Sequence, residues 1–186
     1  MSVRTEHTTE YTHWFITFTC LNWLPLFEIT QSCDLVYKWF NYLRTNKIAE
    51  VEAYVIMPNH LHAILYLPEK DTALNKIVAN GKRFMAYEIV HRLQQKGETK
   101  LLDELSNPLI EHEKKKGQKH RVFKPSFDAK PIFTDKFMLQ KLNYIHNNPV
   151  SGKWQLAEHP AAYEHSSASF YELGVTKYFE PRHFNS

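Results

Sequence analysis

The sequence predicts an α+β fold, in which a ferredoxin-like antiparallel sheet carries helices on one face and a C-terminal extension follows. Segments rich in β-branched and aromatic residues alternate with segments whose apolar residues recur at helical spacing. Their order, β-α-β-β-α-(β)-α, begins with the split β-α-β arrangement of such sheets. With 186 residues and 43% hydrophobic content, the chain suits one domain with a full core. We expect this domain over residues 1–150 and the extension over residues 151–186.

The first half of the chain carries a strand-helix-strand-strand pattern. The expected elements are strands over residues 12–19, 48–57 and 60–67 and a helix over residues 31–45. Thr30 is the candidate N-cap of this helix. Pro58 and Asn59 form a turn signal between the second and third strands, so these two strands are predicted to pair as an antiparallel hairpin.

The second half contains more helix. The expected elements are helices from about residue 72 to 96, 101 to 105 and 135 to 148, and short strands over residues 120–123 and 130–133. Asp71 or Thr72 is expected to cap the long helix, and Asp135 the last one. Gly81 weakens the long helical pattern from within, and Gly97 is expected to end it.

Two regions lack a regular pattern. Residues 107–116, which include a run of lysines, are expected to form a loop or a frayed insertion. Beyond residue 150, Trp154, Pro160 and Tyr163 are expected to anchor the extension to the domain. The run from Ser166 to Ser169 is small and polar, which predicts that it is exposed.

The formal net charge is +3, and the basic residues are clustered. Lys82 and Arg83 fall in the long helical stretch, and a second cluster contains Lys114, Lys115, Lys116, Lys119, His120, Arg121 and Lys124. Such clusters suit a phosphate backbone, although the lysine run also fits a solvated surface.

The cysteines and the hydropathy of the chain bear on its location. Cys20 and Cys33 are too few for a disulfide scaffold, so a reducing cytoplasm is the expected setting. The first ten residues are polar and carry charges of both signs, which does not fit a secretory signal. No apolar run reaches membrane-spanning length, and no membrane partner is expected.

His60 and His62 are two positions apart on the third predicted strand. Alternate side chains of a strand share one face, so the two imidazoles would project side by side, while Leu61 and Ala63 face the other way. Such a pair makes half of a divalent-metal site. A pair of solvated histidines on a strand is the alternative, and the spacing alone does not decide between them.

Tyr144 and Asn148 are four positions apart near the end of the last helix, which places them on one helix face. Asn148 precedes Pro149, so the helix is expected to end at Asn147 or Asn148. A tyrosine hydroxyl is a poor nucleophile at neutral pH, but a nearby divalent cation that polarises a phosphate changes this. Tyrosine, two histidines and an amide oxygen could therefore support phosphoryl transfer through a phosphotyrosine. A tyrosine that packs its ring at a helix end is the alternative.

Together the two motifs resemble those of the single-tyrosine HUH transposases, and most closely the REP-associated tyrosine transposases of bacteria. The first motif is Tyr54-Val55-Ile56-Met57-Pro58-Asn59-His60-Leu61-His62, which is similar to the His-hydrophobic-His element of the family. The second is Leu142-Asn143-Tyr144-Ile145-His146-Asn147-Asn148-Pro149-Val150, which is similar to its nucleophile motif. The segments 14–19 and 163–168 add to the resemblance, which extends from about Tyr11 to Tyr171.

The resemblance implies an HUH transposase fold, with residues 1–150 as the catalytic domain. Tyr144 would attack a phosphodiester of single-stranded DNA beside a hairpin and form a 5′-phosphotyrosine link and a free 3′-hydroxyl. His60, His62 and Asn148 would hold Mg²⁺ or Mn²⁺; because imidazole suits the later metals better, Mn²⁺ should bind at least as well. The candidate DNA contacts are Lys82, Arg83, Lys119, Arg121 and Lys124. Exposed Trp or Tyr rings could stack on unpaired bases.

Details of the second motif refine this expectation. His146 follows Tyr144 by two positions and should point elsewhere on a helix, so it is left out of the site. The family often has a basic residue directly after the Asn-Pro-Val motif, where this chain has Ser151 and Gly152, and Lys153 is the candidate substitute.

The resemblance also implies a bacterial protein that acts in the cytoplasm with the nucleoid. Related transposases include monomers and homodimers that share sites, so both states stay open. Two alternative functions share the fold: a domesticated hairpin-DNA-binding protein with little or no cleavage, and a rolling-circle replication initiator or relaxase. The presence of every expected site residue favours retained chemistry, and the short chain argues against the last class.

Overall fold

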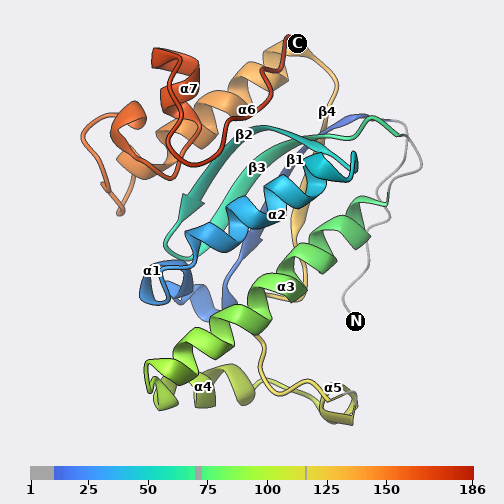
Figure 1. Ribbon diagram of the computed structural model, residues 1–186, viewed down its shortest axis with the longest axis vertical. Coiled ribbons are helices and arrows are strands. Elements are labelled where there is room, and N and C mark those ends of the chain that lie inside the picture. Colours follow the sequence, from blue (N-terminus) through green and yellow to red (C-terminus); the bar gives the residue numbers. More distant parts are fainter. Residues whose placement is uncertain (1–10, 70–72, 116) are drawn as a thin grey trace.

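The protein is built on a four-stranded antiparallel sheet with the strand order β2-β3-β1-β4 (Figure 1). The computed structural model describes residues 11–69, 73–115 and 117–186. The strands are β1 (His13–Thr19), β2 (Glu50–Met57), β3 (His60–Tyr66) and β4 (Asp128–Ile132). β3 lies between β1 and β2 and runs antiparallel to both. This is the split β-α-β arrangement, so the predicted ferredoxin-like fold is confirmed.

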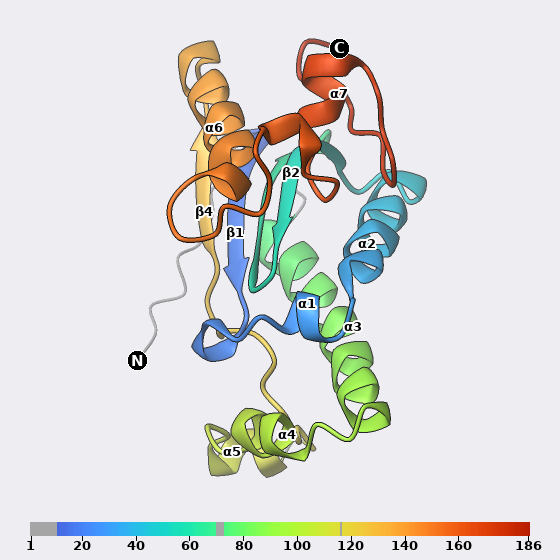
Figure 2. The same ribbon diagram turned by 90° about the vertical axis from the view of Figure 1, so that its left-hand side faces the viewer.

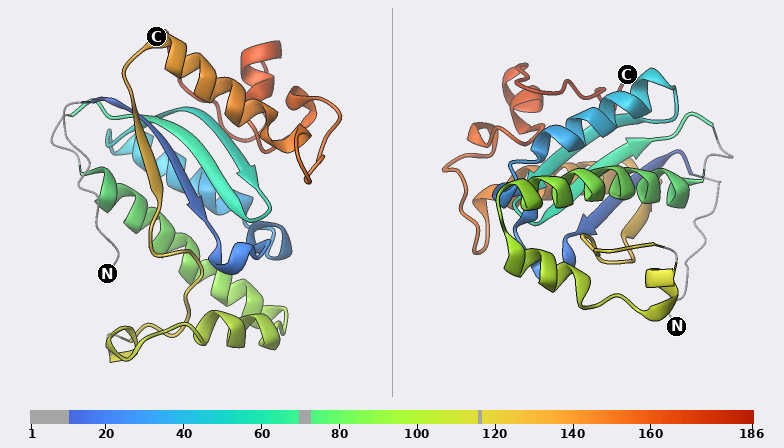
Figure 3. Two further views of the ribbon diagram at one scale, coloured as in Figure 1. Left: turned by 180° about the vertical axis from the view of Figure 1, so that it is seen from behind. Right: turned by 60° about the horizontal axis from the view of Figure 1, so that its bottom comes forward.

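Helices cover both faces of the sheet, although the sequence predicted helices on one face. The two crossover helices, α2 (Cys33–Thr45) and α3 (Leu74–Gln95), pack on one face as expected. The last long helix, α6 (Asp135–Asn147), lies over the other face, where it packs on β2 and β3. Figures 2 and 3 show α6 on the side of the sheet opposite to α2 and α3.

The remaining elements are short. They are η1 (Leu21–Trp23), α1 (Leu26–Ile29), α4 (Thr99–Ser106), α5 (Glu111–Lys115), η2 (Asn148–Val150), η3 (Pro160–Ala162) and α7 (Ala168–Leu173). α4 and α5 stand away from the sheet beyond the end of β1, as Figures 1 and 2 show. The lysine run expected in a loop therefore lies partly in α5, and its member Lys116 is outside the described residues. Within the described ranges, none of the helices is both long and apolar enough to span a membrane.

The β2–β3 hairpin sorts its side chains between the two faces as predicted. Leu61, Ala63 and Leu65 point into the core beneath α2 and α3. His60 and His62 therefore lie on the face that carries α6, because strand residues alternate. The turn itself is braced from outside the hairpin. The carbonyl of Pro58 accepts a hydrogen bond from the Phe27 amide, and that of Asn59 from the Cys20 amide, at 3.0 and 2.8 Å.

Gly81 does not interrupt α3, because its missing side chain makes room for Trp39 of α2. A Cβ atom placed on Gly81 would lie 2.5 Å from Cε2 of the Trp39 indole. Trp39 is buried in the main core, so its ring has no space to withdraw. The glycine that weakens the helical pattern is thus the residue that lets the two helices approach.

We therefore expect Gly81→Ala to destabilise the fold by about 1–3 kcal/mol, the usual cost of overpacking a core. We expect this loss of stability even though alanine has a higher helix propensity than glycine. Thermal or urea unfolding of the purified protein would measure it. The neighbouring exposed substitution Asn80→Ala is the matched control and should be neutral or slightly stabilising. Equal stabilities of the two variants would contradict the packing argument.

Several predicted helix boundaries shift by a few residues. α2 begins at Cys33, and Thr30 is not its N-cap, because the buried Thr30 hydroxyl donates to the Leu26 carbonyl instead. Asp135 does not cap α6 either: Thr134 Oγ1 accepts from the Phe137 amide, and Asp135 sits in the first turn. The proposed cap of α3, Asp71 or Thr72, lies outside the described residues.

The predicted strand over residues 120–123 is wrong. Only Phe123 pairs there, in an isolated bridge with Cys20. The Arg121 amide donates instead to the Leu105 carbonyl of α4, so this stretch ties the projecting helix to the sheet. The other predicted strand is present as β4, two residues earlier than expected, at Asp128–Ile132.

The C-terminal segment adds to the edge of β2 and is not exposed as predicted at Ser166 and Ser167. Ser166 forms a bridge with Val55, and Ser167 donates its amide to the Tyr54 carbonyl. Both serines are buried because they complete the hydrogen bonds of an otherwise open strand edge. The polarity of the serines did not predict their burial, because it gives no sign that the backbone of this segment pairs with the edge of β2.

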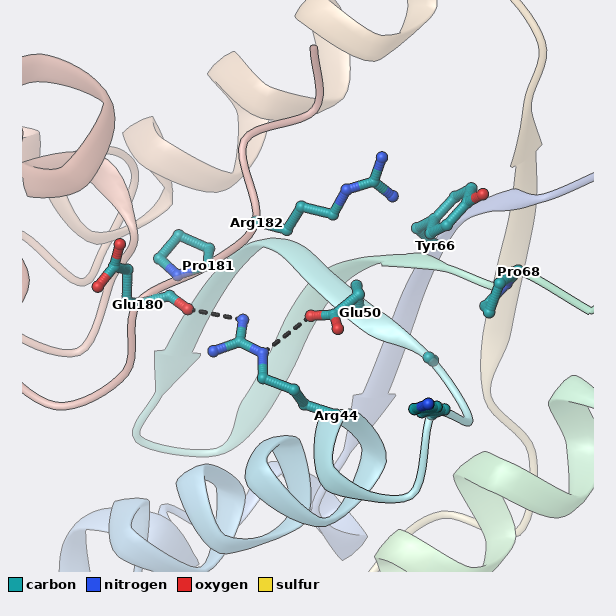
Figure 4. A pocket seen from close by; sticks show the side chains of 9 residues that line it. Arg44, Glu50, Tyr66, Pro68, Glu180, Pro181 and Arg182 are labelled. Atoms are coloured by element: carbon teal, nitrogen blue, oxygen red, sulfur yellow. Dashed lines mark hydrogen bonds and ion pairs between the residues drawn. The ribbon is translucent and has the colours of Figure 1, made fainter. Parts of the chain in front are cut away.

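Near the C-terminus, Arg182 packs against the ends of β2 and β3 that lie far from the hairpin turn. Its guanidinium lies 4.2 Å from the ring centroid of Tyr66, and its amide donates to the Val51 carbonyl. Arg44 bonds both Glu50 and the carbonyl of Glu180 nearby (Figure 4). A hollow of about 580 Å³ at the end of β2 and β3 remote from the hairpin turn is lined by Arg44, Glu50, Tyr66, Glu180 and Arg182, among others. The hollow is therefore separate from the histidine pair.

Candidate active site

The two histidines lie side by side on β3, as their spacing predicts. The ring centroids of His60 and His62 are 4.7 Å apart, with the rings nearly perpendicular. Each ring is held through Nδ1: that of His60 lies 2.6 Å from Asn59 Oδ1, and that of His62 lies 2.6 Å from Thr17 Oγ1. Such partners fix the orientation of a metal-binding imidazole. The sequence did not predict either partner.

Asn59 also fixes the tautomer of His60. Its amide nitrogen donates to the carbonyl of Trp23 at 3.0 Å, so its oxygen is the atom that faces the imidazole. Nδ1 of His60 is therefore the donor, and the lone pair of this neutral ring is on Nε2. Burial lowers the pKa of His60 to about 4 and that of His62 to about 3. Both imidazoles are neutral at physiological pH, which is the form that binds a cation.

Tyr144 approaches the pair from α6. Its hydroxyl lies 3.5 Å from Nε2 of His62, and its ring meets those of His62 and Phe15 edge to face. Tyr144 is 48% exposed, so the side chain is accessible to solvent while its hydroxyl approaches the imidazole. One chain therefore brings together the tyrosine and the two histidines.

Asn148 completes the group at the end of the same helix. α6 ends at Asn147, as the following Pro149 predicted, and Asn148 is its C-cap. The Asn148 side chain lies near His60 and raises the pKa of that imidazole against the larger, opposite effect of burial. His146 faces away, as expected, and contacts Ser167 Oγ at 3.0 Å.

The donor set fits a divalent cation. Among the described residues, no three His, Cys, Asp or Glu side chains gather into a metal-binding group. A third ligand from this chain beside His60 and His62 must therefore be of another type, and the nearby Asn148 side chain can offer its amide oxygen. Two neutral imidazoles and an amide oxygen suit Mn²⁺ better than Mg²⁺, which prefers oxygen ligands.

Two lysines lie near the site: Lys141, which the sequence analysis did not single out, and Lys153, the candidate basic residue after the Asn-Pro-Val motif. Nζ of Lys141 lies 4.4 Å from the ring centroid of Phe15 and 5.4 Å from that of Tyr144. Its position three residues before Tyr144, on the same helix face, was a usable signal. Besides burial, the positive charge of Lys153 lowers the pKa of His60, so Lys153 also lies near the site. The site is therefore bordered by positive charge.

The predicted DNA contacts are not all near this site. Lys82 and Arg83 belong to α3, which covers the opposite face, and Lys82 Nζ donates to the carbonyls of residues 124–126. Burial lowers the pKa of Lys82 to about 8. Lys119 is exposed and Arg121 half-buried in the segment that follows α5. Lys124 lies over the ring of Trp23, which in turn meets the ring of His60.

Comparison with known proteins supports the resemblance through structure. No family model matches the sequence, and no curated protein sequence does. A solved structure of a REP-associated tyrosine transposase bound to a REP hairpin superimposes with a TM-score of 0.63 at 18% identity. The match covers 98% of this chain and 93% of that one. This protein has the fold of a REP-associated tyrosine transposase.

A second solved structure, of a proposed transposase from Deinococcus radiodurans R1, shares 14% identity. The match covers 74% of this chain and 90% of that one, but with a TM-score of 0.43 the two structures are only loosely similar. The fold is thus established by the REP-associated transposase.

Proposed function

We propose that this protein is a transposase that nicks and rejoins single-stranded DNA at hairpins through Tyr144. The observation that carries the proposal is the 3.5 Å approach of the Tyr144 hydroxyl to Nε2 of His62 within one chain. The tyrosine and the histidines come from elements far apart in the sequence. A packing tyrosine and a solvated histidine pair would have no reason to meet.

The proposed reaction is a transesterification. The Tyr144 oxygen attacks the scissile phosphorus and loses its proton to solvent, to which the half-exposed side chain is open. The bond from phosphorus to the 3′ oxygen breaks, and that oxygen takes up a proton. The products are a 5′-phosphotyrosine and a free 3′-hydroxyl, and the same steps in reverse rejoin strands.

His60, His62 and Asn148 are proposed to hold Mn²⁺ or Mg²⁺. A divalent cation there would polarise the scissile phosphate and stabilise its developing negative charge. Asn59 and Thr17 orient the two imidazoles, so the ligand set is organised before any cation binds.

Hairpin-bearing single-stranded DNA is the proposed partner. The solved relative binds a REP hairpin, and this chain has its fold over nearly the whole length. Lys119, Arg121 and Lys124 remain proposed phosphate contacts. Arg83 remains a weaker candidate on the far face, and Lys82 is left out because its ammonium already donates to backbone carbonyls.

The test is to incubate the protein with a pool of hairpin-bearing single strands and Mn²⁺. We expect a covalent adduct that survives denaturing electrophoresis and carries label placed on the 3′ side of the cleaved bond, while label on the 5′ side is released with the free 3′-hydroxyl. Strands that are bound but never linked to protein would instead support the alternative, a domesticated hairpin-binding protein.

Lys141 should contribute to this chemistry. Its ammonium lies over the rings of Phe15 and Tyr144, where a positive charge stabilises a phenolate or a phosphate. We expect Lys141→Met to slow adduct formation by about tenfold, as expected for one partly exposed charge. Lys141→Arg should retain most of the rate.

Single-turnover cleavage rates at saturating DNA would measure this effect separately from binding. Lys136→Met, an exposed lysine in the first turn of the same helix, is the matched control. Equal cleavage rates for the Lys141→Met and Lys136→Met variants would show that the position of Lys141 beside Tyr144 does not matter, and that only the net charge of the protein does.

A further inference from the structure

An exposed tryptophan stands beside the histidine pair. Trp23 is 52% exposed, and its ring centroid lies 6.0 Å from that of His60. Exposure of one aromatic residue is common on protein surfaces and does not by itself indicate a binding site. The backbone at this position, however, is unusual.

Asn22 and Trp23 both adopt left-handed backbone conformations, with φ of 50° and 59°. Bulky residues rarely adopt this region, because the side chain crowds the backbone. Residues in such conformations persist only where their surroundings hold them, and they cluster at ligand sites. The chain thus holds the indole in place against a local conformational preference.

One buried side chain joins this turn to the proposed metal site. Asn59 donates to the Trp23 carbonyl at 3.0 Å and accepts from Nδ1 of His60 at 2.6 Å. The Asn22 amide nitrogen holds the other side of the turn through Glu104 Oε1 of α4, at 2.9 Å. The position of the indole and the orientation of the imidazole are therefore set by the same amide group.

Positive charge accompanies the indole. Nζ of Lys124 lies 4.2 Å from the ring centroid of Trp23, and the Lys124 amide is anchored to the Thr19 carbonyl at the end of β1. An aromatic ring next to a cation is the combination that single-stranded nucleic acids bind, through base stacking and phosphate contact. An apolar ligand would not require the lysine.

We propose that Trp23 stacks on the unpaired nucleobase next to the scissile phosphate, while Lys124 contacts the phosphate of that nucleotide. The inference rests on the proposed function and deepens it. A duplex strand advances about 3.4 Å per nucleotide, and an unstacked single strand advances further. A ring 6.0 Å from His60 is therefore within one nucleotide of a phosphate held at the histidines.

The test uses the full-length Tyr144→Phe protein, so that binding is measured without cleavage. The probe is a hairpin-bearing single strand with 2-aminopurine walked through the unpaired positions. We expect the fluorescence of one position to be quenched on binding, and Trp23→Ala to remove this quenching. Trp23→Ala should also weaken binding by about tenfold, within the range for one stacked base. Trp23→Phe should keep most of both effects.

Two comparisons make the result specific. On a strand with an abasic residue at the quenched position, Trp23→Ala should cause no further loss of affinity, because its partner is already missing. Tyr87→Ala removes a 75% exposed ring from α3, on the opposite face, and should change neither readout. Lys124→Gln should weaken binding and reduce its salt dependence, while the quenching at saturating DNA remains.

The inference is overturned if Trp23→Ala leaves affinity and quenching unchanged, or if its effect persists undiminished on the abasic strand. Melting temperatures of the variants would exclude unfolding as the cause of a loss. Failure of the stacking proposal alone leaves the Tyr144 adduct of the otherwise unchanged protein intact. Absence of that adduct would instead contradict the proposed function.

Discussion

Tyr144→Phe is expected to abolish the covalent protein–DNA adduct while hairpin binding is retained. The substitution removes only the hydroxyl that approaches His62 and leaves the ring on Phe15. Because no second nucleophile is proposed, adduct formation should fall by more than about a thousandfold, as for other nucleophile deletions. The loss of one exposed hydroxyl costs at most about 1 kcal/mol in binding, so affinity should stay within about fivefold.

Labelled single strands and denaturing gels would measure the adduct, and fluorescence anisotropy the binding. Tyr42→Phe is the matched control, because Tyr42 is also exposed but lies on α2, across the sheet. It should form adduct at the unaltered rate. An adduct of undiminished yield with the Tyr144→Phe variant would assign the nucleophile to another residue and remove the basis of the proposed reaction.

The sequence predicted what depends on local geometry. His60 and His62 share a face because strand side chains alternate. α6 ends at Asn147 as predicted, but Asn148 still adopts helical φ and ψ of −56° and −45°, and the chain tightens into the 3-10 helix η2, so the restriction before proline is not what ends it. The meeting of Tyr144 with His62, 82 residues apart in the chain, depends on α6 crossing the face of the sheet that α2 and α3 leave open. No spacing contains that information, and only the family resemblance implied it.

Three residues show where the sequence was silent or misleading, because their contacts are made far along the chain or by an unusual backbone. Trp23 depends on two left-handed residues in a row, which neither composition nor periodicity predicts. Lys82 was chosen for its charge, but that charge is used by carbonyls of the chain itself. Ser167 looked solvated because serine is polar, and it is buried because β2 needs a partner for its edge.

The alternative of a domesticated DNA-binding protein makes a different prediction about the same residues. A protein that only binds hairpins has no need of oriented imidazoles or of a tyrosine hydroxyl near them. In this chain Asn59 and Thr17 both hold a histidine through Nδ1, and the Asn148 side chain lies near His60. Polar contacts this specific are unnecessary for phosphate binding, so the geometry favours retained cleavage.

Removing a proposed metal ligand should weaken Mn²⁺ binding and cleavage together. We expect His60→Ala or His62→Ala to lower Mn²⁺ affinity by at least about a hundredfold, because loss of an orienting partner alone costs about 10–100-fold. Thr17→Val tests that smaller effect, since it keeps the branched shape and removes only the hydroxyl at Nδ1 of His62. Both histidine variants should therefore lose more affinity than Thr17→Val, with adduct yield following affinity at limiting Mn²⁺.

Calorimetric titration of the DNA-free protein with Mn²⁺ measures the affinity of the proposed metal site independently of cleavage. His91→Ala, an exposed histidine of α3, is the matched control and should leave affinity unchanged. Chelation of the cation should stop adduct formation by the unaltered protein, and excess Mn²⁺ should partly restore the Thr17→Val variant but not the His62→Ala variant. If Mn²⁺ affinity stayed the same without His60 or His62, the imidazoles would be structural. Their perpendicular packing 4.7 Å apart would then serve only to position Tyr144.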